Sequence, residues 1–195
     1  GSNVRFEQPL LSHRVYKATA NGGKVFSINP VDYAFNFPCE EKMVTADLIN
    51  ALAKILKLLM QEKSEPMKVL ASIRSSKAAE AIAKTLQSAN KIGIFLGSFA
   101  HNHPNAAYIR QLVAKIAELT GANIGVFTEG ANAAGAYLAG AVPHRGPAGQ
   151  SLEGARGITA REAFVDKPLR AYFFLGFEPE YDTLFPGSAM QALRA

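Results

Sequence analysis

The pattern that most restricts the fold of this chain lies between Lys91 and Arg145, where two short apolar runs flank an amphipathic segment. The runs are Ile92-Gly93-Ile94-Phe95-Leu96 and Ile124-Gly125-Val126-Phe127. Between them, apolar residues recur at helical spacing before Gly121, namely Ile109, Leu112, Val113 and Ile116. A strand, a helix and a second strand in this order predict a βαβ unit. Because such crossovers are nearly always right-handed, we expect the two strands to be parallel and buried.

The segments on either side extend this pattern. A short strand near 24–29 is closed by Pro30, and the aromatic run Leu169–Gly176 predicts a third buried strand at 170–175. Helices are predicted from Thr45, as N-cap, through a stripe of leucines and Ile55, and from Lys77 to about Ser88, capped by Ser75 or Ser76. Ser188 to Arg194 is a further helix start, and residues 4–23 follow no clear period. The sequence therefore predicts an α/β fold with a mostly parallel sheet and helices on its faces.

The expected organisation has three parts. Residues 1–3, Gly-Ser-Asn without methionine, resemble the remnant left when a protease removes an expression tag. Residues 4–43 are an irregular N-terminal segment with a short strand. Residues 44–195 are the α/β domain, which we expect to be truncated at its C-terminus, so that the chain is a piece of a longer protein.

Composition excludes several classes of protein. With 48% hydrophobic and 19% charged residues, the chain is typical of an ordered globular domain. The net charge of +5 comes from Lys and Arg spread along the chain, without the basic and aromatic cluster of a nucleic-acid binder. A single cysteine, Cys39, cannot hold an iron–sulfur cluster and suits a reducing compartment. No apolar stretch reaches the ~20 residues that a membrane span needs, so direct membrane insertion is not expected.

Open parallel sheets bind ligands beyond the carboxyl ends of their strands. The residues at the predicted ends are Gly97, Ser98, Glu129, Gly130, Asn132 and Gly176. Nucleotide fingerprints are missing there, because Gly97 opens no G-x-G-x-x-G motif and the Gly130–Gly135 spacing lacks the lysine of a phosphate loop. Tight turns and close packing explain these glycines better. We expect these positions to be no more than a vestigial pocket.

No catalytic or metal-binding set of residues emerges from the sequence. Glu129 at a strand end is a candidate general base, but nothing marks its pKa as perturbed. His101 and His103 lack a nearby third ligand, so a loop before a helix that starts at Pro104 explains them better than a metal. His144-Arg145 suits either an anion contact or a surface loop.

The central stretch resembles the molybdopterin oxidoreductase family. The resemblance rests on Ile94-Phe95-Leu96-Gly97, on Leu119-Thr120-Gly121-Ala122-Asn123-Ile124-Gly125, and on Glu129 to Arg145, and it covers about residues 90–150. Within that family, the stretch from Glu129 to Arg145 resembles one branch, the large iron–sulfur subunits of bacterial NADH-quinone oxidoreductase, respiratory complex I. The resemblance implies a Rossmann-like three-layer αβα fold, as in formate dehydrogenase and DMSO reductase.

The same resemblance implies a peripheral-arm subunit on the cytoplasmic side of the bacterial inner membrane, with other subunits of the complex as partners. The iron–sulfur clusters of such subunits belong to the parent chain, and this stretch has no cysteine motif for them. The expectation is a non-catalytic scaffold that binds neither metal nor pterin. Two alternatives stay open: a free-standing Rossmann-like nucleotide-binding enzyme, and the pterin-binding domain of an active molybdoenzyme such as a formate dehydrogenase.

Overall fold

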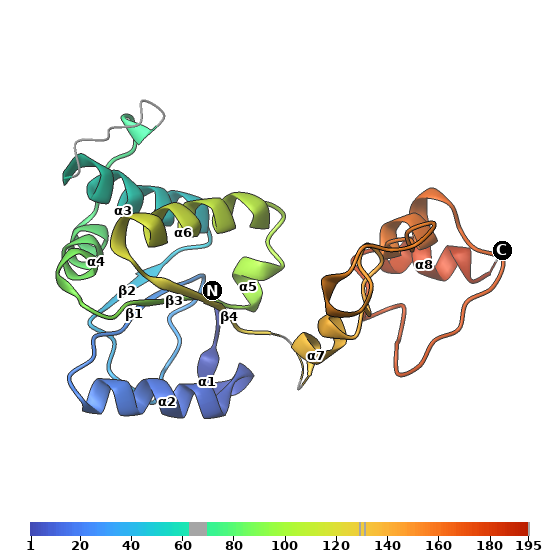
Figure 1. Cartoon of the computed structure of the whole chain (residues 1–195), viewed down its shortest axis with the longest axis horizontal. Coiled ribbons are helices and arrows are strands. Elements are labelled where there is room, and N and C mark those ends of the chain that lie inside the picture. Colours follow the sequence, from blue (N-terminus) through green and yellow to red (C-terminus); the bar gives the residue numbers. More distant parts are fainter. Residues whose placement is uncertain (63–69, 129, 131, 195) are drawn as a thin grey trace. The chain divides into compact units, whose positions relative to one another are not determined.

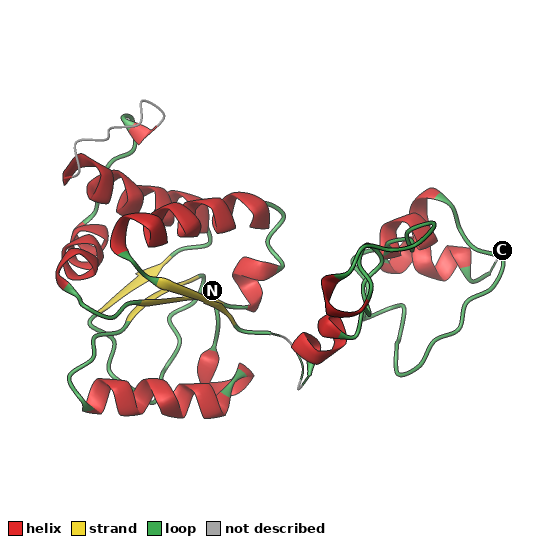
Figure 2. Cartoon of the chain, viewed as in Figure 1, coloured by secondary structure: helices red, strands yellow, loops and turns green. Residues whose placement is uncertain are grey.

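A computed structural model describes residues 1–62, 70–128, 130 and 132–194. The chain divides into two compact units, Gly1–Glu129 and Gly130–Ala195. The first unit contains all four strands of the described residues together with six helices, whereas the second is built of short helical turns and irregular backbone (Figure 2). In the described part of the chain, no helix combines the length and the apolar character needed to cross a lipid bilayer.

The strands of the first unit form two parallel pairs. β1 (Phe26–Asn29) pairs with β2 (Glu41–Val44), and β3 (Gly93–Leu96) pairs with β4 (Asn123–Val126). The strands predicted near 24–29, 92–97 and 123–127 are thus confirmed, and β3 and β4 are parallel as expected. The expected burial of these two strands is wrong, because Phe95, Ile124 and Val126 are 54%, 47% and 45% exposed. The single continuous sheet is not formed, because the described residues make two separate two-stranded sheets. β2 was missed because charged residues interrupt its apolar pattern.

The predicted βαβ unit is present. α6 (Ala106–Thr120) connects β3 to β4 and buries Ile109, Val113 and Ile116, which belong to the predicted apolar stripe. It ends at Gly121, where φ is +72° and a side chain would strain the backbone. The predicted start at Pro104 is two residues early, since the helix begins at Ala106 after the short helix α5 (Ser98–His101).

The core of the first unit lies where α3 (Leu48–Glu62) and α4 (Lys77–Ser88) pack with α6. These three helices lie on one side of the strands (Figure 1). The prediction that Thr45 caps α3 is wrong. Asp47 directly precedes the helix, and its carboxylate accepts the Asn50 N–H at 3.0 Å. Of the two serines proposed for α4, Ser76 is the cap, and its hydroxyl accepts the Ala79 N–H at 3.3 Å.

α1 (Val4–Glu7) and α2 (Pro9–Ala20) lie on the opposite side of the strands (Figure 1). The sequence left this region unassigned because its large apolar side chains point outward, with Leu10 83% exposed. The buried Ser12 hydroxyl holds α2 in place by donating to Asn36 Oδ1 at 2.5 Å. Helices therefore cover both sides of the strands in this unit.

The second unit holds α7 (Ala133–Leu138), the 3₁₀ turn η2 (Pro147–Gly149), the π-helical turn η3 (Glu162–Asp166) and α8 (Pro186–Ala192). The strand predicted at 170–175 is wrong, since this segment has irregular backbone. Its backbone joins no sheet, and its aromatic rings stack on Phe164 instead. The ring centroids of Phe164 and Tyr172 lie 5.3 Å apart, and the Tyr172 hydroxyl donates to Ala163 O at 2.7 Å. The helix predicted near Ser188 is present as α8.

Candidate functional site

The carboxyl end of β3 meets the first residues of the chain. Gly97 follows β3 directly, and the Gly1 carbonyl accepts the Phe99 N–H at 3.0 Å. A Cβ atom on Gly97 would collide with the Gly1 carbonyl oxygen and with Ser2 Cβ. Only glycine leaves room for this close approach. Close packing, one of the two roles expected for these glycines, therefore explains Gly97.

A cavity of about 400 Å³ opens at this point, and we call it the Ser98 crevice. Its lining comes from the start of the chain, from α1, from the loop between β1 and β2, and from the stretch after β3. The residues are Gly1, Ser2, Glu7, Tyr33, Ser98, Phe99, Asn102, His103 and Pro104. No lysine or arginine is among them. Crevices beyond the carboxyl ends of parallel strands are the usual ligand sites of α/β folds, which makes this the candidate site of the first unit.

The Glu7 carboxylate occupies the polar side of the Ser98 crevice. It accepts hydrogen bonds from Ser98 Oγ at 2.8 Å, from Ser2 Oγ at 2.9 Å and from the Asn3 backbone N–H at 2.6 Å. Partial burial by itself would raise the pKa of Glu7, but these three donors and the nearby amino terminus hold that pKa below its usual range. The carboxylate is therefore ionised at neutral pH, and it takes up donors that an anionic ligand would need.

The predicted site residues fall into both units. Gly97 and Ser98 meet in the Ser98 crevice, whereas Gly130, Asn132 and Gly176 belong to the second unit. There, Gly130 and Gly176 have φ of +74° and +62°, which fits turns that favour glycine. Asn132 lies just before α7, and its side chain closely approaches Gly135. Glu129 lies outside the described residues.

The histidines near the crevice make structural contacts. His103 Nδ1 accepts the Asn105 N–H at 3.0 Å, and its ring lies edge-on to Phe99. His101 Nδ1 lies 3.3 Å from the Arg110 guanidinium. Among the residues that the structure describes, no three His, Cys, Asp or Glu side chains gather as a metal site.

Sequence reasoning missed Ser2 and Glu7. Glu7 and Ser98 are 91 residues apart, and no local pattern connects them. The available signal was the helix start itself: Asn3 precedes α1, and an acidic residue in its first turn often bonds back to the preceding backbone N–H.

The family model for Molybdopterin oxidoreductase matches residues 1–184. The chain belongs to the molybdopterin oxidoreductase family. The match spans nearly the whole chain and includes Gly1–Asn3 and the irregular aromatic segment of the second unit. No curated protein and no solved structure matches the chain significantly.

The family implies a pterin cofactor, which is anionic through its phosphate. As arranged in the Ser98 crevice, the residues of this chain do not fit such a group. The donors face the Glu7 carboxylate, and the lining offers no lysine or arginine to offset a second negative charge.

Proposed function

We propose that this chain is part of a non-catalytic, molybdopterin oxidoreductase-like scaffold domain in the G chain of bacterial NADH-quinone oxidoreductase. That G chain is the large iron–sulfur subunit of respiratory complex I, which passes electrons from NADH to quinone and couples this transfer to proton pumping. In this proposal the chain binds neither molybdenum nor pterin, and the iron–sulfur clusters lie elsewhere in the parent chain.

Two lines of support lead to this assignment. The family membership covers residues 1–184 and supports an oxidoreductase context. The finer assignment to the respiratory branch is supported by the residues from Ile94 to Arg145 that resemble its large subunit. The proposal extends to other subunits of the complex as partners and to the peripheral arm on the cytoplasmic side of the inner membrane.

The position of Glu7 is the main support for the proposal that this chain is not catalytic. A carboxylate that accepts hydrogen bonds from Ser2, Asn3 and Ser98 satisfies the polar groups of the Ser98 crevice from within the chain. An incoming phosphate would have to displace the Glu7 carboxylate from these donors, and the crevice lining in the described residues has no lysine or arginine side chain to offset the added charge. In this proposal the crevice is a former ligand site that the protein fills with its own side chain.

The finer fold is also a proposal. α3, α4 and α6 lie on one side of the strands and α2 lies on the other, which supports a Rossmann-like three-layer αβα arrangement in the first unit (Figure 1). This arrangement hosts many activities, so it gives no support to catalysis by itself.

The decisive experiment uses the intact protein that contains this chain, purified from membranes. We expect iron without stoichiometric molybdenum or pterin, and co-purification with NADH:quinone oxidoreductase activity. Molybdenum and an extractable pterin at one per chain would overturn the proposal in favour of an active molybdoenzyme. A nucleotide that raises the melting temperature of this 195-residue chain in proportion to its occupancy would instead favour the free-standing nucleotide-binding enzyme.

A matched pair of variants tests the role of Glu7 directly. Glu7→Ala frees the donors of the Ser98 crevice, so we expect inorganic phosphate to raise the melting temperature of this variant and not of the parent chain. Ser98→Ala in the Glu7→Ala background removes one of these donors and should reduce the response. If phosphate affects the parent chain and Glu7→Ala equally, the carboxylate does not fill an anion site.

A further inference from the structure

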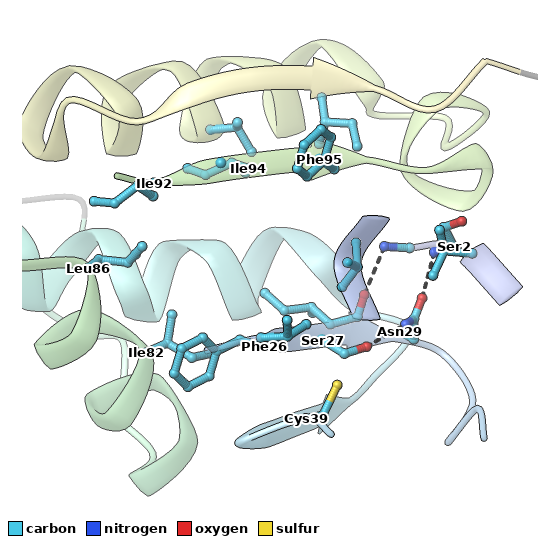
Figure 3. Close-up of a pocket in the computed structure, with 18 of the residues that line it drawn as sticks. Ser2, Phe26, Ser27, Asn29, Cys39, Ile82, Leu86, Ile92, Ile94 and Phe95 are labelled. Carbon is cyan, nitrogen blue, oxygen red and sulfur yellow. Dashed lines mark hydrogen bonds between the residues drawn. The ribbon is translucent and has the colours of Figure 1, made fainter. Parts of the chain in front are cut away.

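A second cavity separates the two strand pairs of the first unit. It has a volume of about 430 Å³, and we call it the β1–β3 cavity. Figure 3 shows Ile92, Ile94 and Phe95 along its β3 side and Phe26 and Ser27 along its β1 side. No strand of the described residues lies between β1 and β3, although both run in the same direction as their own partners.

The backbone on the β1 side presents regular hydrogen-bonding groups to this cavity. β1 uses the carbonyls of Val25 and Asn29 to accept from Glu40 and Thr45, on its β2 side. Because backbone groups alternate in direction along a strand, the N–H and C=O groups of Phe26 and Ile28 point to the opposite edge. The bond from the Gly1 amino group to Ile28 O at 2.9 Å confirms this direction.

The β3 side has the same arrangement. The Ile92 and Leu96 carbonyls accept from Asn123 and Phe127 on the β4 side, so the backbone groups of Gly93 and Phe95 point away from β4. Among the described residues, no backbone hydrogen bond is found for Gly93 or Phe95 on that side. In the described residues, the edge groups of β1 and β3 other than Ile28 O thus have no backbone partner and line one cavity. An additional strand would satisfy this arrangement.

The first residues of the chain already occupy the carboxyl end of this cavity. Gly1 bonds β1 through Ile28 O, and its carbonyl accepts the Phe99 N–H beyond β3. Ser2 continues with an N–H donated to Asn29 Oδ1 at 2.7 Å (Figure 3). A polypeptide that runs through the cavity toward Gly1 would therefore point in the same direction as β1 and β3.

Side chains on both faces of the cavity are mostly apolar. α3, α4 and α6 contribute Leu52, Ile82 and Val113 on one face, while α2 and the following loops contribute Val15 and Phe37 on the other. A strand buried on both faces needs apolar side chains at every position, in contrast to the alternating pattern of a half-exposed strand. The cavity thus defines the chemistry of its occupant as well as its direction.

We propose that the β1–β3 cavity holds a fifth parallel strand, an extended apolar segment that leads directly into Gly1; this proposal replaces the expectation that residues 1–3 are a tag remnant. A segment of about five residues matches its neighbours. The five strands then form one sheet in the order β2, β1, new strand, β3, β4. Numbered along the chain, this order is 3-2-1-4-5, the sequence of a doubly wound sheet.

The test compares the 195-residue chain with two extended chains. One carries Val-Ile-Val-Ile-Val immediately before Gly1, and the matched control carries Ser-Gly-Ser-Gly-Ser, each after an initiator methionine. The first readout is amide hydrogen exchange at Phe26, Ile28, Gly93 and Phe95, whose N–H groups face the cavity. The second readout is the reaction rate of Cys39, a cavity-lining thiol, with a disulfide reagent.

We expect the apolar extension alone to slow exchange at these four amides by about tenfold or more and to slow the reaction of Cys39. Equal exchange in the two extended chains would overturn the proposal. So would an apolar extension that prevents folding while the Ser-Gly extension folds. Protection by the same apolar peptide added as a separate molecule, but not by the fused segment, would also overturn it, because the occupant would then belong to another chain. These outcomes are independent of whether the protein binds pterin.

Discussion

The amino group of Gly1 gives the 195-residue chain a pH-dependent stability that can be calculated. It lies buried against Ile28 O, and the loss of water around it lowers its pKa from 8.0 to about 6, although the Glu7 carboxylate opposes this shift. Between pH 6 and 8 the folded chain therefore binds fewer protons than the unfolded chain, so the free energy of unfolding rises with pH across this window. Two pKa units at 1.36 kcal/mol each make the chain about 2 to 3 kcal/mol less stable below pH 6 than above pH 8.

The assay is urea unfolding followed by far-UV circular dichroism, because the chain contains no tryptophan. The control is the same chain acetylated at Gly1, which has no titratable amine. We expect a stability that rises between pH 6 and 8 in the free chain and a flat profile in the acetylated chain. Glu7 and Glu162 have lowered pKa values and act only at more acidic pH. Equal slopes for the two chains in this window would refute the buried position of the amino group.

Two further predictions concern packing. Gly97→Ala places a Cβ against Gly1 and Ser2 and should destabilise the chain by about 1 to 3 kcal/mol in the same urea assay. The control is Gly187→Ala in α8, where a Cβ meets open space; it should be neutral or stabilising by up to about 1 kcal/mol. Ile109→Ala shortens a side chain that is 1% exposed and should lower the free energy of unfolding by about 2 to 5 kcal/mol. Ile124→Ala changes a residue that is 47% exposed and should lower it clearly less. Similar losses of stability in the two variants would contradict the assigned core.

The sequence predicted the part of the fold that local periodicity determines. The βαβ unit was correct because short apolar runs mark β3 and β4 and an apolar stripe at helical spacing marks α6. The prediction of α4 was correct because Ser76 caps a helix with a clear apolar face. The strand predicted at 170–175 was wrong because that prediction also used only the local apolar pattern. Its aromatic residues suit a buried strand, yet tertiary ring stacking on Phe164 determines their conformation instead.

The sequence predicted only those residues of the candidate site that follow directly after a predicted strand. Gly97 and Ser98 follow from the end of β3, but Glu7 reaches them from the start of the chain through contacts that depend on the folded backbone. The two-sheet arrangement was equally inaccessible. An apolar pattern predicts strands, but it does not predict which strand edges pair, because pairing depends on segments far apart in the sequence.

Gly1 and Ser2 line both the Ser98 crevice and the β1–β3 cavity. With the proposed strand in place, Gly1–Asn3 follow the central strand and Gly97–Ser98 follow its neighbour, at the point where the strand order reverses. Doubly wound sheets bind ligands at this point, because backbone donors of two loops converge there. In this chain the donors are Ser2 Oγ, the Asn3 N–H and Ser98 Oγ, and all three bond to one acceptor within the chain. The Glu7 carboxylate is that acceptor, so in the proposed scaffold role it would hold the geometry of this strand-end site without a ligand.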